Sequence, residues 1–156
     1  MTTEVASARP GARLGQSNEF TLVLPLKPGG AERMREAHSN LAADLRARLD
    51  RVATVHDLRF VIFDNDTRLI FASTFDGGWE AYIDDFATLI PEVIDQEFRE
   101  VVGYPGIHSP DIKDFIARHQ VTGLTFYSAY PDASVRDVWK ALKVRAAFDE
   151  LLDAIG

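Results

Sequence analysis

The segment from Asp57 to Thr74 constrains the fold most strongly, because it has the pattern of two strands joined by a tight turn. Asn65 and Asp66 are residue types that tolerate the left-handed backbone of a two-residue turn. Pairing outward from this turn sorts the side chains onto two faces, and a slip of one residue would exchange the faces. The pairs on the first face are Ile62 with Leu69, Phe60 with Phe71, and Leu58 with Ser73. The pairs on the second face are Val61 with Ile70, Arg59 with Ala72, and Asp57 with Thr74.

The remaining elements are predicted from periodicity and from breaker residues. Residues 19–27 alternate as a strand with one buried face, and 31–52 have the apolar spacing of a helix. A helical region covers 78–102, in which Pro91 starts a second helix or kinks the first. We further expect a short helix over 110–119, a strand over 123–130 and a last helix that ends at about Ala154.

This order of elements is that of a ferredoxin-like α+β sandwich, βαββαβ, with an added C-terminal helix. We expect an antiparallel four-stranded sheet with helices on one face and the other face bare. Residues 1–18 are small, polar and aperiodic, and are predicted to form a flexible N-terminal tail. Residues 19–156 are predicted to form a single ferredoxin-like domain.

Composition and motifs argue against several classes of protein. The chain has 156 residues and no cysteine, which excludes disulfides and thiolate chemistry and agrees with a cytoplasmic location. Its net charge of −7 argues against binding to nucleic acid. No apolar run has the length of a membrane span or of a signal sequence, so we expect no membrane partner. Histidine–carboxylate metal motifs do not occur, so no dedicated metal site is expected.

The second face of the predicted sheet mixes apolar residues with an arginine and small polar residues. Such a face is usually covered, and in ferredoxin-like domains the common cover is the sheet of a second copy. We therefore predict a homodimer whose sheets enclose a cavity for a small-molecule ligand. Arg59 and Tyr127 are predicted to lie in this cavity, where a guanidinium and a phenol could hold an anionic or carbonyl oxygen. The alternative is that Arg59 forms an ion pair with Asp57 or Asp76 at the dimer interface.

Three segments of the chain carry a resemblance to known proteins: HDLRFVIFDNDTRLIFASTFDGGWEAYIDDF, the following GYP, and TFYSAYPDASVRDVWKALKVRAAFDELLDA. Over residues 19–130 the order of elements resembles the dimeric α/β-barrel superfamily. That superfamily includes antibiotic-biosynthesis monooxygenases, cyclases, isomerases, chlorite dismutases, dye-decolorising peroxidases and haem-degrading enzymes. The quoted segments are similar to a poorly characterised bacterial family whose members occur alone or beside peroxidase-like domains. The resemblance implies a dimeric barrel and a monooxygenase- or peroxidase-like oxidoreductase, with haem as a candidate cofactor.

Histidines are the residues through which such a haem would be held. The resemblance points to a histidine on or beside a helix, which makes His119 and His108 the first candidates and His38 the third. The alternative for each is a capping or surface histidine, and His119 would in any case suit a helix C-terminus.

Asp76 lies where the second strand of the hairpin becomes a helix. It is predicted either to cap that helix or to reach a ligand beside Arg59 as a catalytic residue. The GxxDG segment of dye-decolorising peroxidases is not matched here, because Ser73 stands three residues before Asp76.

Three functions remain open from the sequence. The first is an enzyme of oxidative or secondary metabolism that binds an apolar substrate over the sheet, with haem or without a cofactor. The second is a non-catalytic ligand-binding or accessory module that partners a redox enzyme. The third is a structural dimerisation domain.

Overall fold

The computed structural model describes residues 11–156, apart from the side chains of 40–43. Its sheet is antiparallel and open, with β2 (Ser17–Pro25) and β4 (Arg68–Asp76) in the middle. β3 (Val55–Phe63) forms one edge. The fold is therefore α+β and compatible with the predicted ferredoxin-like fold, whereas the dimer and the barrel stay predictions.

The predicted hairpin register is confirmed pair by pair. Every pair expected on the two faces is observed, from Asp57 opposite Thr74 to Ile62 opposite Leu69. Asn65 and Asp66 have φ angles of 51° and 65°, the left-handed values that this turn requires. A bulge between Val55 and Asp57 interrupts the ladder at its far end.

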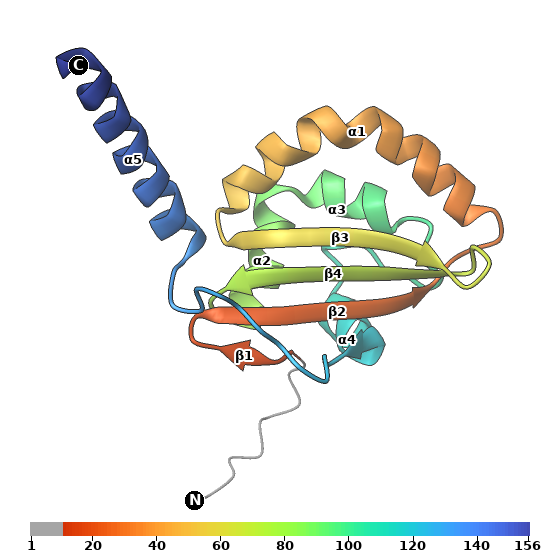
Figure 1. The fold of residues 1–156 in the computed structure, drawn as a ribbon. Helices are drawn as coiled ribbons and strands as arrows, with labels where there is room; N and C mark the ends of the chain where they lie inside the picture. Colours follow the sequence, from red (N-terminus) through yellow and green to blue (C-terminus); the bar gives the residue numbers. More distant parts are fainter. Residues whose placement is uncertain (1–10) are drawn as a thin grey trace, which may run out of the picture.

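Four helices lie on one face of the sheet (Figure 1). They are α1 (Gly30–Val52), α2 (Trp79–Leu89), α3 (Pro91–Phe98) and α4 (Ile112–His119). Pro91 starts the second helix of the predicted helical region, as its missing amide proton favours. α4 begins at Ile112, two residues after the proline that was expected to open it, because Ser109 and Pro110 belong to the preceding turn.

The core between these helices and the sheet is rich in aromatic rings. Phe75 stacks on Tyr82 with ring centroids 3.9 Å apart, and Phe20 meets Tyr82 edge-on at 5.5 Å. The Tyr82 hydroxyl lies 2.7 Å from Ser73 Oγ in a buried hydrogen bond. Burying each such side chain contributes roughly 1.5–3 kcal/mol, so this face of the hairpin anchors the fold.

The strand predicted over 123–130 is wrong. Only β5 (Gln120–Val121) pairs with the outer edge of β2 in this part of the chain. No backbone hydrogen bond among the described residues involves 124–129. These residues favour strands by type, so the cause lies in the edge that they would have to join.

β1 (Arg13–Leu14) occupies the part of that edge which the predicted strand would need. It pairs with Ser17 and Asn18 at the start of β2. The register of β5, continued along the chain, would bring Leu124 and Thr125 opposite the same two residues. One side of a strand pairs with one neighbour at a time, so β1 excludes the predicted strand.

The predicted N-terminal tail differs from the structure in its last residues. β1 and the first two residues of β2 are regular strand where a flexible tail over 1–18 was expected. Residues 1–10 of that tail lie outside the described residues. β1 could not be predicted from periodicity, because a two-residue strand is too short to show alternation.

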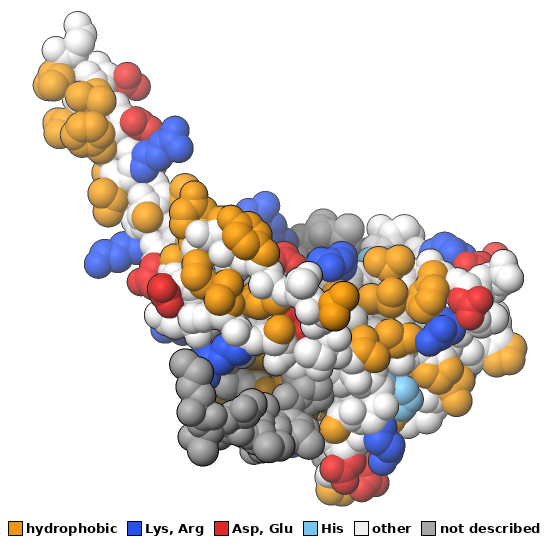
Figure 2. Space-filling view, turned by 60° about the horizontal axis from the view of Figure 1, so that its bottom comes forward, with side chains coloured by type: hydrophobic (Ala, Val, Ile, Leu, Met, Phe, Trp, Pro, Cys, Tyr) orange, Lys and Arg blue, Asp and Glu red, His pale blue; other side chains and the backbone are white. Residues whose placement is uncertain are grey.

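The last helix, α5 (Val135–Ile155), is confirmed and extends away from the body of the molecule (Figure 1). A capping box closes its start, in which Ser134 Oγ accepts a hydrogen bond from the Asp137 amide at 3.1 Å. Many of its apolar side chains are exposed, and Figure 2 shows hydrophobic groups along it. Among the described residues, no helix combines the length and the apolar character needed to cross a bilayer.

Candidate functional site

The open face of the sheet carries three rows of side chains that the observed register sets side by side. The rows are Asp57–Thr74–Glu19, Arg59–Ala72–Thr21 and Val61–Ile70–Val23. The first two rows are largely polar and the third is apolar. The open face is therefore divided into a polar half and an apolar half.

A hollow of about 400 Å³ lies over the polar half, between the sheet and residues 123–127. Arg59 and Tyr127 both line it, as do Asp57, Thr21 and Glu19. Arg59 and Tyr127, which were predicted to share a cavity, thus line the same hollow. Both side chains are largely open to solvent, so the hollow in a single chain is shallow and uncovered.

The predicted ion pair between Arg59 and Asp57 is present. Arg59 Nη1 lies 3.7 Å from Asp57 Oδ1, and both side chains are more than half exposed. An exposed pair at this distance holds its partners weakly in water. The guanidinium therefore remains free to donate to the oxygen of a ligand.

Glu19 is a residue of the site that sequence reasoning missed. Its carboxylate accepts hydrogen bonds from Thr21 Oγ1 at 2.7 Å, from the Gly123 amide at 3.2 Å and from the Ala12 amide at 3.1 Å. It thereby holds the start of the 123–127 segment beside the sheet. The available signal was the alternation of β2, which places Glu19 and Thr21 on the open face together.

Asp76 does not line the hollow. Its Oδ1 lies 2.6 Å from His56 Nε2, and its Oδ2 accepts a hydrogen bond from the Val135 amide at 2.7 Å. The prediction that Asp76 caps the following helix is wrong, because α2 begins after Gly78 without a side-chain cap. Instead, Asp76 binds the first turn of α5, 59 residues further along the chain. Its predicted role beside Arg59 has no geometric support.

The histidines predicted to hold haem lie apart from the hollow. His119 Nδ1 is 2.8 Å from the Phe115 carbonyl one helical turn earlier, and the two rings pack together. His108 is exposed in the loop before α4. His38 lines a different groove, between α1 and β3.

A haem in the hollow is therefore not supported by these residues, since none of the three histidines lines it. Among the described side chains, no group of three or more histidine, aspartate or glutamate residues could hold a metal ion.

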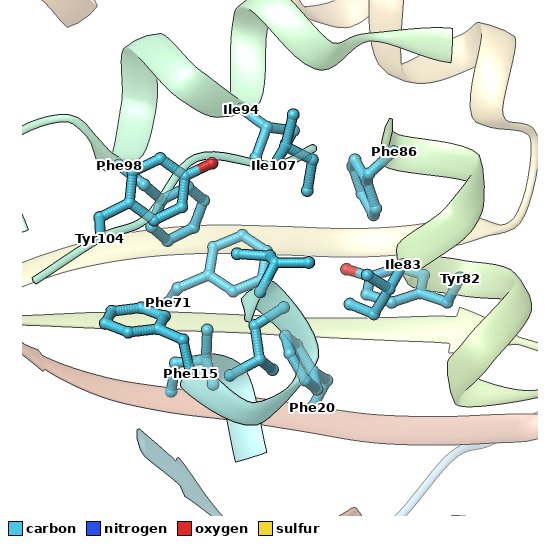
Figure 3. Close-up of a pocket in the computed structure, with 13 residues that line it drawn as sticks. Phe20, Phe71, Tyr82, Ile83, Phe86, Ile94, Phe98, Tyr104, Ile107 and Phe115 are labelled. Atoms are coloured by element: carbon cyan, nitrogen blue, oxygen red, sulfur yellow. The ribbon is translucent and has the colours of Figure 1, made fainter. Parts of the chain in front are cut away.

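A second cavity, of about 40 Å³, lies between the helices and the sheet (Figure 3). Its lining is made of aromatic and aliphatic side chains, and the two phenol groups among them already have partners. Tyr82 is bonded to Ser73, and Tyr104 donates to Asp95 Oδ1 at 2.8 Å. Burial raises the pKa of both phenols above that of free tyrosine, so they stay neutral. The volume admits water or a small gas molecule, and we assign this cavity to core packing.

Comparisons with known protein families, with curated proteins and with solved structures found no match to this chain. The resemblance to the dimeric α/β-barrel superfamily therefore rests on the order of elements and on the segments in which it was seen.

Proposed function

We propose that this protein binds a small, mostly apolar molecule with a carbonyl oxygen in the hollow over its open sheet face. The observation that carries the proposal is that Arg59 and Tyr127 line the same hollow beside an apolar row of the sheet. In the fuller form of the proposal, the protein is an enzyme of oxidative or secondary metabolism acting on this ligand.

The charges around the hollow favour a neutral ligand. Arg59 is balanced by Asp57, and the carboxylate of Glu19 lies on the same wall. An anion would meet two carboxylates and one guanidinium, whereas a carbonyl oxygen could accept from Arg59 without that repulsion. The apolar body of the ligand would lie over the row formed by Val61, Ile70 and Val23.

A homodimer that closes the hollow is part of the proposal. Val61 is 41% exposed on the open face. Leu124 and Tyr130, in the segment that follows β5, are 100% and 77% exposed. Apolar surface of this extent in a soluble protein usually marks an interface. A second copy laid against the open face would cover these residues and remove water from around Arg59, which strengthens its hydrogen bond to the ligand.

The chemistry that such a site supports is proton transfer at the carbonyl oxygen. Arg59 would polarise the carbonyl group, and the Tyr127 phenol would donate to the oxygen as enolate character develops. The proton that the carbon beside the carbonyl gives up would pass to the carboxylate of Asp57, which lines the same hollow. The step therefore needs these three side chains and the ligand.

The test uses prodan, a neutral naphthyl ketone whose fluorescence responds to the surroundings of its carbonyl group. We expect saturable binding to the purified protein, weakened about tenfold or more by Arg59→Gln and less by Tyr127→Phe. Arg118→Gln is the matched control, because Arg118 is an exposed arginine of α4 outside the hollow. Equal binding by wild type and Arg59→Gln would contradict the proposal.

Sedimentation equilibrium tests the dimer independently, and 2-naphthoate tests the preference for a neutral ligand. We expect a dimer at micromolar concentration and weaker binding of the carboxylate than of the ketone. If the protein is a monomer and still binds prodan, the binding site stands and the homodimer part of the proposal is wrong.

A further inference from the structure

A buried carboxylate outside the hollow is joined to a histidine at the surface. Glu97 of α3 is 4% exposed, and its Oε2 lies 3.0 Å from Nδ1 of His38 on α1. The other oxygen, Oε1, is buried and has no hydrogen-bond partner. Burying a carboxylate with one oxygen unpaired is costly, so the position of this group calls for an explanation.

His38 presents its ring to a groove between α1 and β3. The groove has a volume of about 720 Å³, and Met34, Leu45, Leu58 and Phe60 give it an apolar wall. The His38 ring meets Phe60 edge-on with centroids 5.3 Å apart, which fixes the plane of the imidazole. Because Nδ1 faces Glu97, Nε2 is the nitrogen left for a ligand.

Two arginines also line this groove, and both have carboxylate partners elsewhere. Arg35 donates two hydrogen bonds to Asp66, at 2.9 Å and 2.6 Å. Arg59 lies beside Asp57. The groove therefore combines an apolar wall with a basic imidazole nitrogen, while the charges of both arginines are balanced by carboxylates. That combination suits an apolar molecule that can give up a proton to the imidazole.

We propose that the groove binds an apolar molecule with an acidic O–H group, a phenol or an enol, and that His38 Nε2 takes its proton. The O–H bond breaks with its electron pair left on oxygen, and an N–H bond forms at Nε2. Return of the proton from Nε2 to oxygen or to a conjugated carbon completes the transfer without any redox partner. Arg59 borders both this groove and the hollow under Proposed function, but His38 lines the groove alone. The proposal for the groove therefore does not depend on the proposal for the hollow.

Glu97 acts in this site as a positioning residue. It accepts the Nδ1 proton, so that Nε2 is the basic nitrogen of the neutral ring, and its negative charge stabilises the imidazolium that forms. Burial raises the pKa of Glu97, while the nearby His38 opposes that shift. A protonated His38 and an ionised Glu97 would therefore favour each other once the ligand has given up its proton.

The experiment compares 4-nitrophenol with 4-nitroanisole, which has the same ring and no ionisable hydrogen. In wild type we expect 4-nitrophenol to bind about tenfold or more tightly than 4-nitroanisole, with a larger phenolate fraction than in free solution at the same pH. His38→Gln keeps an amide that can donate to Glu97 but cannot take a proton at neutral pH. It should lose the preference for the phenol while 4-nitroanisole binding stays within about twofold.

Glu97→Gln supplies a readout that packing alone would not move. The bound phenol should titrate at higher pH in this variant, because the imidazolium loses its counter-charge. His108→Gln is the control for an exposed histidine, and Tyr127→Phe the control for the hollow. Both should leave the preference for the phenol unchanged.

Titration of wild type by NMR provides a measurement that needs no variant to fold. The chain has four histidines, and the ring signals of one of them should move toward the imidazolium position on addition of 4-nitrophenol but not of 4-nitroanisole. No binding of 4-nitrophenol to folded wild type would overturn the proposal. Equal affinity for the two probes, or loss of phenol binding in Tyr127→Phe, would also overturn it.

Discussion

The body of the molecule, residues 17–121, and the C-terminal segment, 122–156, are both rich in apolar side chains but bury them to very different extents. In the body, Leu24 and Leu69 are 0% exposed within a network of aromatic rings. In the C-terminal segment, Leu151 is 56% exposed. Hydrophobic residues stabilise a fold only where a facing surface exists. Most of the C-terminal segment lacks one, and Val135 at the start of α5, which is 5% exposed, is the exception.

The two regions are joined by a few polar contacts and by the buried side chain of Val135, and not by an extended shared core. Asp76 accepts a hydrogen bond from the first amide of α5, and the Gln16 amide donates to the Pro131 carbonyl at 2.9 Å. These contacts fix where the C-terminal segment leaves the body. They do not cover its apolar side chains, which a second copy could do.

The largest test of this comparison is a matched pair of leucine truncations. Leu24→Ala should lower the free energy of unfolding by about 2–5 kcal/mol, because it leaves a cavity in a closed core. Leu151→Ala should change it by less than about 0.5 kcal/mol if α5 has no partner. Urea unfolding followed by tryptophan fluorescence and by circular dichroism measures both.

A large loss of unfolding free energy in Leu151→Ala would contradict the view that the apolar side chains of α5 have no facing surface. It would mean that α5 is packed in solution, and a loss that shrinks on dilution would identify the cover as a second copy. A loss independent of concentration would instead place α5 against its own body.

The next test concerns the buried hydrogen bond between Ser73 and Tyr82. Ser73→Ala and Tyr82→Phe should each cost about 1–3 kcal/mol, since each leaves a buried hydroxyl unpaired. The double variant should cost less than the sum of the two. Tyr127→Phe, an exposed phenol of the C-terminal segment, is the control and should change stability by less than about 0.5 kcal/mol. Additive losses in the double variant would show that the two hydroxyls are not coupled.

Sequence patterns predicted the body well because both the turn and the alternation of the two strands constrain the register of its hairpin. The Asn65–Asp66 turn and the alternation of the two strands allow one register, and each expected pair is found. Pro91 similarly fixes the start of α3. Local chemistry decided these elements, so local reasoning was sufficient.

The edge of β2 could not be predicted in the same way, because two segments compete for it. Residues 123–130 have the stronger strand propensity, yet β1 holds the place beside Ser17 and Asn18. The outcome depends on the short connection between β1 and β2, and propensity does not register that advantage of proximity.

The candidate site was predicted in part for the same reason. Arg59 and its face follow from the hairpin register, so their position was foreseeable. Asp76 binds α5 and Glu97 binds His38 across 59 residues each, and no local pattern indicates contacts of that span.

A smaller effect concerns the pH dependence of the body's stability through Glu97. Burial raises its folded-state pKa, so the folded protein holds this proton more tightly than the unfolded chain does. The stability that Glu97 contributes is fully present below the unfolded pKa of about 4.3 and is lost as the pH rises through the folded pKa. Glu97→Gln has no carboxyl group to titrate, so the free energy of unfolding of this variant, relative to that of wild type, should rise between pH 4 and pH 7.

Urea unfolding of Glu97→Gln and wild type at pH 4, 5.5 and 7 measures this gain. If the free energy of unfolding of Glu97→Gln falls relative to that of wild type as the pH rises, the attraction between the Glu97 carboxylate and a charged His38 outweighs the cost of burying the carboxylate. His108→Gln, an exposed histidine, should show no trend beyond that of wild type.

The smallest expected effect on global stability is at the start of α5. Ser134→Ala removes a capping box that normally contributes about 1 kcal/mol to the helix it closes. In an unpacked helix that energy is lost locally, so global unfolding should shift by less than about 0.5 kcal/mol. Amide hydrogen exchange should accelerate in the first turns of α5 and stay unchanged in β2 and β4. A full loss of about 1 kcal/mol in the unfolding transition would show instead that α5 unfolds together with the body, which requires that its apolar side chains be covered.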